Sequence, residues 1–481
     1  MRRNINRIKK TLLLISLVFC TLLTQAQTGR TFIVKNSTDG LSELHVSLPR
    51  FPSGKAIVAC PGGAYGGLSF DKEGTDWAPF FNERGIAYCT LKYRLPNGHP
   101  DVPVTDACHA IKLVRDSAEA WKINPYDVGI MGFSAGGHLA ATVSTQAPFE
   151  SRPDFSILFY PVISIDERLG HQGSTRRFLG EQKNDPVMIE RYSAERHVDH
   201  FSTPPALLLL SNDDRVVPPV SNAIAYYTAM RKAGNECTMH IYPSGDHGWG
   251  YASWFKHHEQ MLADLDYWLK NHRAQPKQEA VRVACLGNSI TRGSCINMAS
   301  IHGYPAQLQK LLGNSYRVRN FGMPGYTMLR QGDFPYMSSK AWQMALDFNP
   351  NIVVVKFGTN DTKPHNWAHA ADFEHDLQLM IDTLQALPTH PRIILATPVK
   401  AFKETFGISD STIVNGVIPA IRKVAKKNRL EVLDLHAVIT DEKHITADGI
   451  HPNQNGAADM AKAVADIITT EQKEPKKKNN K

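Results

Sequence analysis

The sequence alternates short apolar runs with amphipathic stretches, and the alternation occurs twice, on either side of a polar stretch, 271–279, that lacks periodicity. Alternating strand and helix patterns are typical of a parallel sheet with helices on its faces. A chain of 481 residues is also too long for one comfortable hydrophobic core. The sequence therefore predicts the α/β fold class, with two domains at 27–270 and 280–470 and a linker at 271–279.

The predicted strands can be assigned from the apolar runs. Those of the first series are 56–60, 86–92, 128–132, 155–160, 206–211 and 238–242, and those of the second are 281–286, 316–321, 352–357, 393–397 and 430–435. Helical spacing of apolar residues predicts helices between them, notably at 373–387 and 417–427. The segment 166–204 breaks this rhythm and is long for a connection, so we interpret it as a cap over the functional site.

The first 26 residues predict a signal peptide. Five basic residues within 1–10 precede an apolar run at 12–23, which is too short to span a bilayer, and Thr24-Gln25-Ala26 then offers small residues for cleavage. We therefore expect an exported protein, periplasmic or secreted, whose mature chain begins near Gln27 and has no integral membrane span. Cys20 leaves a lipoprotein as the alternative, although the bulky Phe19 before it disfavours lipidation.

The formal net charge of +8 is concentrated at the two ends of the chain. Residues 1–10 carry five positive charges, and the tail 471–481, which we expect to be disordered, carries a net three. The body between them is therefore neutral. A nucleic-acid partner is disfavoured, because binding a polyanion requires a basic surface.

Six cysteines remain after the predicted cleavage. They are Cys60, Cys89, Cys108, Cys237, Cys285 and Cys295. No CxxC motif or Cys/His spacing indicates a metal site, so no metal is expected. We interpret the six as buried free thiols, because Cys in an apolar segment behaves as a small hydrophobe.

A G-x-S-x-G motif follows the predicted strand 128–132. Ser134 lies between Gly132 and Gly136, as in a nucleophile elbow, where side chains on the flanking residues would clash. The glycine-rich stretch 60–67 ends the first predicted strand. There the backbone N–H groups of Gly63 and Ala64, with that of Ala135, are candidate donors to an oxyanion.

An acid and a histidine follow Ser134 in chain order. Asp214 comes at the end of the strand 206–211, and His247 comes after the next strand. The order Ser, Asp, His is that of α/β-hydrolases. Each piece alone has a structural explanation, such as a tight turn or a helix cap. Three pieces in order at predicted strand ends favour catalysis.

Residues 55–270 resemble α/β-hydrolase esterases of the acetylxylan-esterase-like group. Besides the triad pieces, the similar local patterns are 160–164, 171–174, 178–180, 214–218 and 242–245. The resemblance implies an α/β-hydrolase fold with a mostly parallel, doubly wound sheet, and a triad of Ser134, Asp214 and His247. The choice of Asp214 over Asp213 follows the D-x-x-V-P spacing of that group.

The second series carries four blocks at strand ends. Ser289 follows the first strand, Gly325 lies beyond the second, Asn360 follows the third, and 448–452 reads D-G-I-H-P just before the last helix. Glycine lets the backbone approach a reacting centre, and an Asn side chain is a neutral donor.

These blocks resemble the SGNH (GDSL) hydrolase family over residues 280–468. The resemblance implies a flavodoxin-like, three-layer α/β/α domain with Ser289 as nucleophile, His451 as base and Asp448 to orient it. The Ser289 backbone, the Gly325 N–H and the Asn360 side chain would hold the oxyanion. Asn288 departs from the family by standing where the GDSL signature has Asp; it is not the nucleophile, so activity is still expected.

Together the two resemblances imply a serine esterase with two active sites and no cofactor. Export and families that often act on acylated sugars favour an acylated carbohydrate partner, such as acetylated xylan; this is an argument by analogy. A lipase or lysophospholipase is one alternative, a peptidase a second, and a non-catalytic carbohydrate-binding protein a third. Trp249 and Trp254 are candidates for stacking on a sugar ring, although packing is the more ordinary role for them.

Overall fold

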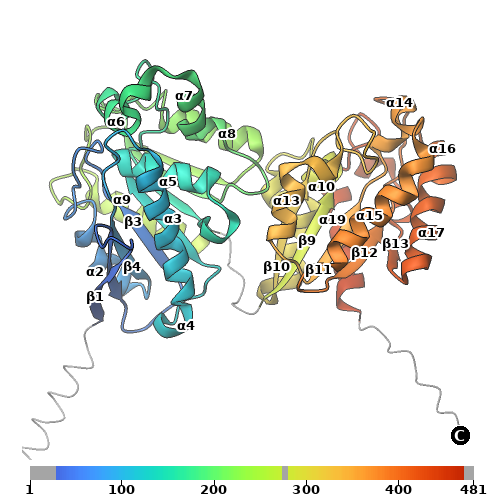
Figure 1. The fold of residues 1–481 in the computed structure, drawn as a ribbon, viewed down its shortest axis with the longest axis horizontal. Coiled ribbons are helices and arrows are strands. Elements are labelled where there is room, and N and C mark those ends of the chain that lie inside the picture. Colours follow the sequence, from blue (N-terminus) through green and yellow to red (C-terminus); the bar gives the residue numbers. More distant parts are fainter. Residues whose placement is uncertain (1–28, 273–279, 471–481) are drawn as a thin grey trace, which may run out of the picture. The chain divides into compact units, whose positions relative to one another are not determined.

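The computed structural model describes residues 29–272 and 280–470. The predicted signal peptide, the tail 471–481 and most of the predicted linker lie outside these ranges. Contacts divide the chain into two units, with the short segments 198–203 and 228–237 grouped with the second. Each unit is an α/β domain around its own sheet (Figure 1). Within the described ranges, no helix is long and apolar enough to cross a membrane.

The first domain contains an eight-stranded sheet in the order β1-β2-β4-β3-β5-β6-β7-β8. Its strands are β1 (Arg30–Lys35), β2 (Glu43–Leu48), β3 (Ala56–Cys60), β4 (Ala87–Lys92), β5 (Val128–Phe133), β6 (Ser156–Phe159), β7 (Ala206–Ser211) and β8 (Cys237–Tyr242). The pairs between β4 and β7 are parallel, whereas β1 and β2 run antiparallel to their neighbours. The mostly parallel sheet expected from the sequence is confirmed.

Helices cover both faces of this sheet. They are α2 (Ala78–Glu83), α3 (Asp101–Asp116), α4 (Ala118–Trp121), α5 (Ser134–Gln146), α6 (Gln172–Leu179), α7 (Pro186–Tyr192), α8 (Ala223–Ala233) and α9 (His258–Asn271). Helices α3 and α5 pack side by side on one face, and α2 and α9 lie on the other (Figure 1). An ion pair of 2.6 Å between Arg84 and Asp266 links α2 to α9. Strands β3 and β5 are buried throughout because both faces are covered.

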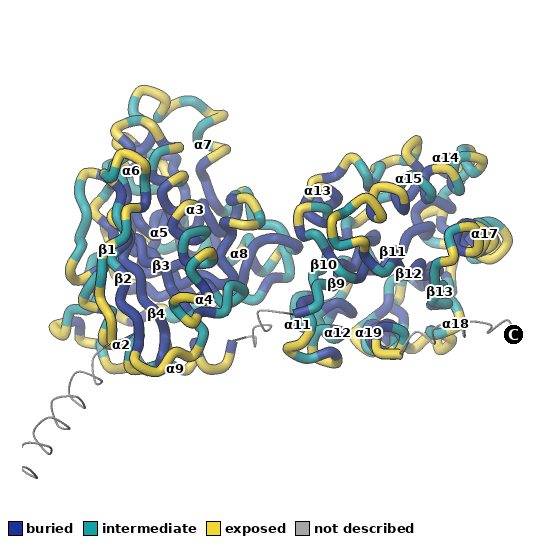
Figure 2. Tube along the Cα trace, turned by 60° about the horizontal axis from the view of Figure 1, so that its bottom comes forward, coloured by how far each residue is buried: buried dark blue, intermediate teal, exposed yellow. Residues whose placement is uncertain are grey.

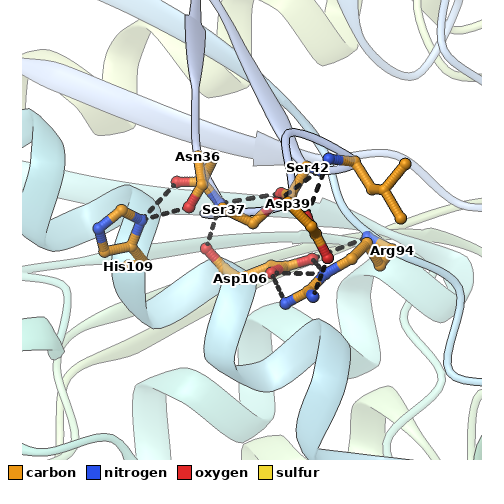
Figure 3. Close-up of polar contacts among 8 residues, drawn as sticks. Asn36, Ser37, Asp39, Ser42, Arg94, Asp106 and His109 are labelled. Atoms are coloured by element: carbon orange, nitrogen blue, oxygen red, sulfur yellow. Dashed lines mark hydrogen bonds and ion pairs between the residues drawn. The ribbon is translucent and has the colours of Figure 1, made fainter.

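The hairpin of β1 and β2 was not predicted from the sequence. A buried polar cluster fixes its turn to the domain (Figure 3). The Asn36 amide donates to Ser42 Oγ and to the Asp106 carbonyl of α3, both at 2.9 Å. The Asp106 carboxylate accepts from the Arg94 guanidinium, which also pairs with Asp39. Polar contacts therefore hold this edge of the sheet in addition to apolar burial.

The predicted cap segment, 166–204, contains α6 and α7 with two 3₁₀ turns, Gly180–Asn184 and Ala194–Arg196. It contacts the glycine-rich loop after β3, where Arg177 Nη1 donates to the Ala64 carbonyl at 3.4 Å. Burial, together with the nearby His247, lowers the pKa of His171 at the start of α6. The segment therefore lies beside the predicted first site.

The second domain contains a five-stranded parallel sheet in the order β10-β9-β11-β12-β13. Its strands are β9 (Val281–Gly287), β10 (Tyr316–Gly322), β11 (Ile352–Lys356), β12 (Arg392–Ala396) and β13 (Glu431–Leu433). Its helices are α10 (Ser289–Arg292), α11 (Ala299–His302), α12 (Tyr304–Leu312), α13 (Lys340–Asp347), α14 (Pro364–Trp367), α15 (Phe373–Gln385), α16 (Asp410–Thr412), α17 (Ile418–Asn428), α18 (Leu435–Val438) and α19 (Gln454–Thr469).

The sheet of the second domain lies between two layers of helices. Helices α12 and α19 pack on each other and on one face, where a core cluster includes Leu308, Val354 and Met460. Helices α13 and α15 lie on the opposite side, and the buried strands run between the two layers (Figure 2). This is the three-layer α/β/α arrangement predicted from the sequence.

Candidate active sites

Ser134, Asp214 and His247 are brought together at the carboxyl ends of the first sheet's strands. His247 Nε2 lies 2.8 Å from Ser134 Oγ, and His247 Nδ1 lies 2.7 Å from Asp214 Oδ2. The other Asp214 oxygen accepts hydrogen bonds from the backbone N–H groups of Val216 and Val217. Asp213 instead accepts from the Asp246 N–H. The structure thus places Asp214, and not its neighbour, behind the imidazole.

The turn from β5 into α5 has the geometry of a nucleophile elbow. Ser134 has a φ of +52°, in the left-handed region that side chains other than Gly disfavour. A Cβ on Gly132 would lie 2.2 Å from the Gly136 carbonyl oxygen, and one on Gly136 would lie 2.1 Å from that of Cys60. Glycine is therefore required at both positions flanking Ser134.

The glycine-rich loop lies against the nucleophile. A Cβ on Gly62 would come within 3.1 Å of Ser134 Cβ, and the Gly62 N–H already donates to Glu73. The next backbone N–H groups, of Gly63 and Ala64, are the candidate oxyanion donors. Ala135 lies in the first turn of α5, where an N–H has no acceptor within the helix. The three candidate donors therefore lie on the two segments that meet at Ser134.

Two buried side chains that the sequence analysis missed support this loop. Glu73 Oε2 accepts from the Gly62 N–H at 3.0 Å, and its Oε1 accepts from the Tyr160 hydroxyl at 2.7 Å. Burial raises the pKa of Glu73. His138, one turn after Ser134 on α5, contacts the Tyr65 hydroxyl and the Tyr192 carbonyl oxygen, both at 2.8 Å. Burial lowers the pKa of His138 to about 4, so it bridges the loop and the cap as a neutral imidazole.

Ser289, His451 and Asp448 form the corresponding chain in the second domain. His451 Nε2 lies 2.8 Å from Ser289 Oγ, and His451 Nδ1 lies 2.7 Å from Asp448 Oδ2. Asp448 Oδ1 accepts from the N–H groups of His451 and Ile450 and from the Thr446 hydroxyl. Burial would raise the pKa of Asp448, but these hydrogen bonds lower it to about 2.

The predicted oxyanion residues of this domain lie on neighbouring loops. Gly325 has a φ of +85°. The Asn360 amide nitrogen donates to the carbonyl oxygen of Tyr326, next to Gly325, at 2.9 Å. An amide NH₂ has two protons, so this bond orients the group and leaves the second proton for another acceptor. Asp361 accepts from the N–H groups of Leu329 and Gly358 and so ties the same two loops together.

The departure at Asn288 has a structural partner in Lys356. Asn288 caps α10 by accepting from the Ile290 N–H, and its Oδ1 also lies 3.1 Å from Lys356 Nζ. Lys356 is the last residue of β11 and is fully buried. Burial lowers the pKa of Lys356 to about 7, although the nearby Asp361 opposes the shift. No sequence pattern indicated a role for Lys356, because it ends an otherwise apolar run.

The structure also shows the surroundings of the six cysteines and of the two tryptophans considered for sugar stacking. All six cysteines are free, but only Cys60, Cys89 and Cys285 are buried, and Cys295 is exposed, contrary to expectation. The Cys295 thiol lies 4.0 Å from Asp448 Oδ2. Trp249 is buried, stacks on Phe255 and donates to Ser211, so it has a packing role, whereas Trp254 is exposed.

Each domain is an α/β fold in which a serine hydroxyl, an imidazole and a carboxylate lie in contact, which is the arrangement of the serine hydrolases. Residues 57–250 match the family model for the alpha/beta hydrolase fold, and residues 285–458 match that for the GDSL-like Lipase/Acylhydrolase family. The chain is 49% identical over 476 residues to an acetylxylan esterase of Xylanibacter ruminicola, across 95% of this chain and 99% of that protein. The chain belongs to the family of that acetylxylan esterase.

Two further likenesses concern part of the chain. It is 30% identical over 207 residues to an endo-1,4-beta-xylanase B of Butyrivibrio fibrisolvens, across 40% of this chain and 32% of that protein. A solved structure of an acetyl ester-xyloside bifunctional hydrolase from Caldicellulosiruptor lactoaceticus is 30% identical and has a TM-score of 0.46, across 50% of this chain and 97% of that one.

Proposed function

We propose that the protein is an exported esterase with two active sites, which removes O-acetyl or related acyl groups from a plant polysaccharide such as acetylated xylan. Its domains would span 27–270 and 280–470, joined by the linker 271–279 and followed by the basic tail. The observation that carries the proposal is the near full-length similarity to an acetylxylan esterase. The Ser–His–Asp contacts in each domain support two sites over one.

The same reaction suits both sites. Histidine takes the serine proton as the hydroxyl oxygen attacks the ester carbonyl, and the carboxylate behind the histidine stabilises the imidazolium. Backbone N–H groups of Gly63, Ala64 and Ala135 would hold the oxyanion in the first site. The Ser289 backbone, Gly325 and Asn360 would do so in the second. Histidine then protonates the departing alcohol, and water repeats the cycle to release the acid.

Single and double nucleophile variants test this proposal. Acetate release from acetylated xylan, and turnover of 4-nitrophenyl acetate, would be measured for the wild type, Ser134→Ala, Ser289→Ala and the double variant. We expect both single variants to retain activity and the double variant to retain none. If one single variant is as inactive as the double variant, the chain has one active site and not two.

The same set of enzymes separates the alternatives through their substrates. Preferential release of fatty acid from lipids over acetate from acetylated xylan would replace the proposal with a lipase. Absence of turnover on every ester, together with binding to xylan, would indicate a non-catalytic carbohydrate-binding protein. Comparison of acetylated xylan, mannan and pectin would identify the polysaccharide.

Export is proposed from the charge and hydropathy pattern of residues 1–26. N-terminal sequencing of the protein recovered from the producing cells is expected to begin near Gln27. Recovery of a chain that retains the apolar run 12–23 would contradict cleavage at the proposed site.

A further inference from the structure

A pocket of about 510 Å³ lies in the second domain between two segments that are far apart in sequence. One wall follows Asn360 and contributes Thr362, Pro364 and Trp367. The other wall precedes α17 and contributes Glu404 and Ser409. The two walls are joined where the Ser409 N–H donates to Thr362 Oγ1 at 3.4 Å.

Both walls are attached to the second catalytic site. Thr362 lies two residues after Asn360 in the same 3₁₀ turn, Asn360–Thr362. On the other wall, the Thr405 hydroxyl donates to the Asp448 carbonyl at 2.7 Å, and the ring of Phe406 lies 6.4 Å from that of His451. A small buried cluster that includes Ile408 and Ile450 supports the second wall next to His451. The loop that carries Asn360 and the loop that contacts Asp448 therefore also form the two walls of the pocket.

The lining of the pocket combines an aromatic ring with hydrogen-bonding groups. Trp367 and Pro364 supply apolar surface, and the fit of the indole against Gly416 and Phe373 fixes its position. Glu404 supplies a carboxylate whose Oε1 accepts from the Ser409 hydroxyl at 3.2 Å, whereas the Thr362 hydroxyl is buried and donates to the Thr359 carbonyl. A sugar ring presents apolar C–H faces and polar hydroxyl edges, so this mixture of groups is complementary to it.

The charge of the lining narrows the ligand further. In the described part of the chain, the residues that line the pocket include one acid, Glu404, and no base. A carboxylate accepts strong hydrogen bonds from neutral hydroxyl groups but repels an anionic ligand. The acyl chain of a lipid would cover the polar groups of the pocket without offering them hydrogen bonds, which is unfavourable.

We propose that this pocket binds a neutral sugar residue of the acylated oligosaccharide on which Ser289 acts, and so sets the substrate preference of the second site. The inference rests on the proposed function. It adds that the second site recognises the sugar as well as the acyl group, and that it discriminates against uronate chains such as those of pectin.

Kinetics of the second site alone test the proposal. In a Ser134→Ala background, kcat/KM would be measured for an acetylated xylo-oligosaccharide and for 4-nitrophenyl acetate, which carries the same acyl group without a sugar. We expect Glu404→Ala to lower the ratio of the two values about tenfold, mainly through KM for the oligosaccharide, because a charged hydrogen bond is lost. Glu374→Ala, which removes a glutamate on α15 outside the pocket, is the matched control and is expected to leave the ratio at its parental value.

A second variant and a second substrate extend the test. Trp367→Leu removes the aromatic face of the pocket and is expected to lower the same ratio. Trp367 also packs on Phe373, so this variant could fail to fold. Glu404 is exposed, so Glu404→Ala still tests the proposal in that case. Glu404→Gln is expected to raise activity on an acetylated oligogalacturonate relative to the xylo-oligosaccharide, because the repelling charge is removed.

The outcomes separate this inference from the function on which it rests. If Ser134→Ala enzyme releases acetate from the xylo-oligosaccharide but Glu404→Ala leaves the ratio unchanged, the pocket is not a sugar site and the proposed function stands. If that enzyme hydrolyses 4-nitrophenyl acetate but no acetylated neutral oligosaccharide, both proposals fail for the second domain.

Discussion

Ser134 and Ser289 lie in different backbone conformations. Ser134 has a left-handed φ of +52° and depends on close packing around Gly132 and Gly136, whereas Ser289 begins α10 behind the capping side chain of Asn288. A strained residue persists only where its surroundings determine its conformation. The first site therefore depends on the buried groups that fix the loop after β3, and the second depends on buried hydrogen bonds beneath α10.

Glu73 is the buried group that most directly fixes the first site. Glu73→Ala leaves the Gly62 N–H and the Tyr160 hydroxyl without their acceptor, at a cost on the order of 1–3 kcal/mol for each buried group. We expect kcat of the first site to fall about 10- to 100-fold, measured with 4-nitrophenyl acetate in a Ser289→Ala background, and Glu73→Gln to restore part of the loss, because an amide offers one acceptor oxygen in place of two. The same change in a Ser134→Ala background serves as the control, and an equal loss there would contradict a local role.

Asp448 should affect both catalysis and acid stability. Asp448→Asn removes the carboxylate that orients His451, so a loss of about 10³ to 10⁴ in kcat of the second site is expected. Because the folded pKa of Asp448 is about 2 and its ordinary value is 3.8, its charge stabilises the fold above about pH 4, and this contribution is lost as the pH falls toward 2. Urea unfolding at pH 5, 4 and 3 should show the stability gap between wild type and variant narrowing. A gap that stays constant over this range would contradict the lowered pKa.

At the scale of secondary-structure elements, Lys356 joins the end of β11 to the start of α10. Its Nζ lies 3.1 Å from Asn288 Oδ1 and 3.3 Å from Thr359 Oγ1, so it connects the loop that carries Ser289 to the loop that carries Asn360. An ordinary lysine titrates near 10.5, and burial lowers the pKa of Lys356 to about 7. The contact of Lys356 with Asn288 and Thr359 should therefore make the stability of the second domain depend on pH.

Lys356→Met tests this coupling. Between pH 10 and 7 the unfolded chain binds a proton that the folded chain does not, so the stability of the wild type falls as the pH falls through this range. The variant lacks this loss, so its free energy of unfolding should rise relative to that of the wild type as the pH falls from 9 to 7. Lys423→Met, at an exposed position of α17, should show no such trend. Parallel pH curves for Lys356→Met and the wild type would refute the lowered pKa.

The central strands of both sheets were predicted from the sequence because strands buried on both faces read as continuous apolar runs. The β1–β2 hairpin was not predicted, because a strand at the edge of a sheet does not read as a continuous apolar run. β1 is an edge strand with an exposed or half-exposed side chain at every position, and buried polar groups such as Asn36 hold its turn. The alternation in Glu43–Leu48 is the signal that could have identified β2.

In the two candidate sites, the residues within recognisable motifs were predicted, whereas the buried residues that hold them in place were not. Ser134 and Ser289 follow strands in patterned segments, and the structure brings each into contact with the expected histidine. Glu73, His138 and Lys356 have no pattern, because the burial of an ionisable side chain depends on segments far away in sequence. Choosing Asp214 over Asp213 required the family resemblance, since both follow the same strand.

At the scale of the whole molecule, the two active sites proposed on one chain predict an effect that neither has alone. When one domain is bound to a polymer, the covalent continuity of the protein keeps the other at high local concentration near the same polymer. An equimolar mixture of the two domains, 27–270 and 280–470, produced as separate proteins contains the same two sites, but on separate molecules.

The mixture and the wild type can be compared at equal concentrations of each active site. On 4-nitrophenyl acetate, which each site turns over separately, the two preparations are expected to have equal rates. On acetylated xylan at low enzyme concentration, acetate release by the wild type should exceed that by the mixture several-fold, and the difference should vanish when both sites are saturated. Equal rates on the polymer at every concentration would mean that the two sites act on separate substrates, and that joining them confers no advantage on this one.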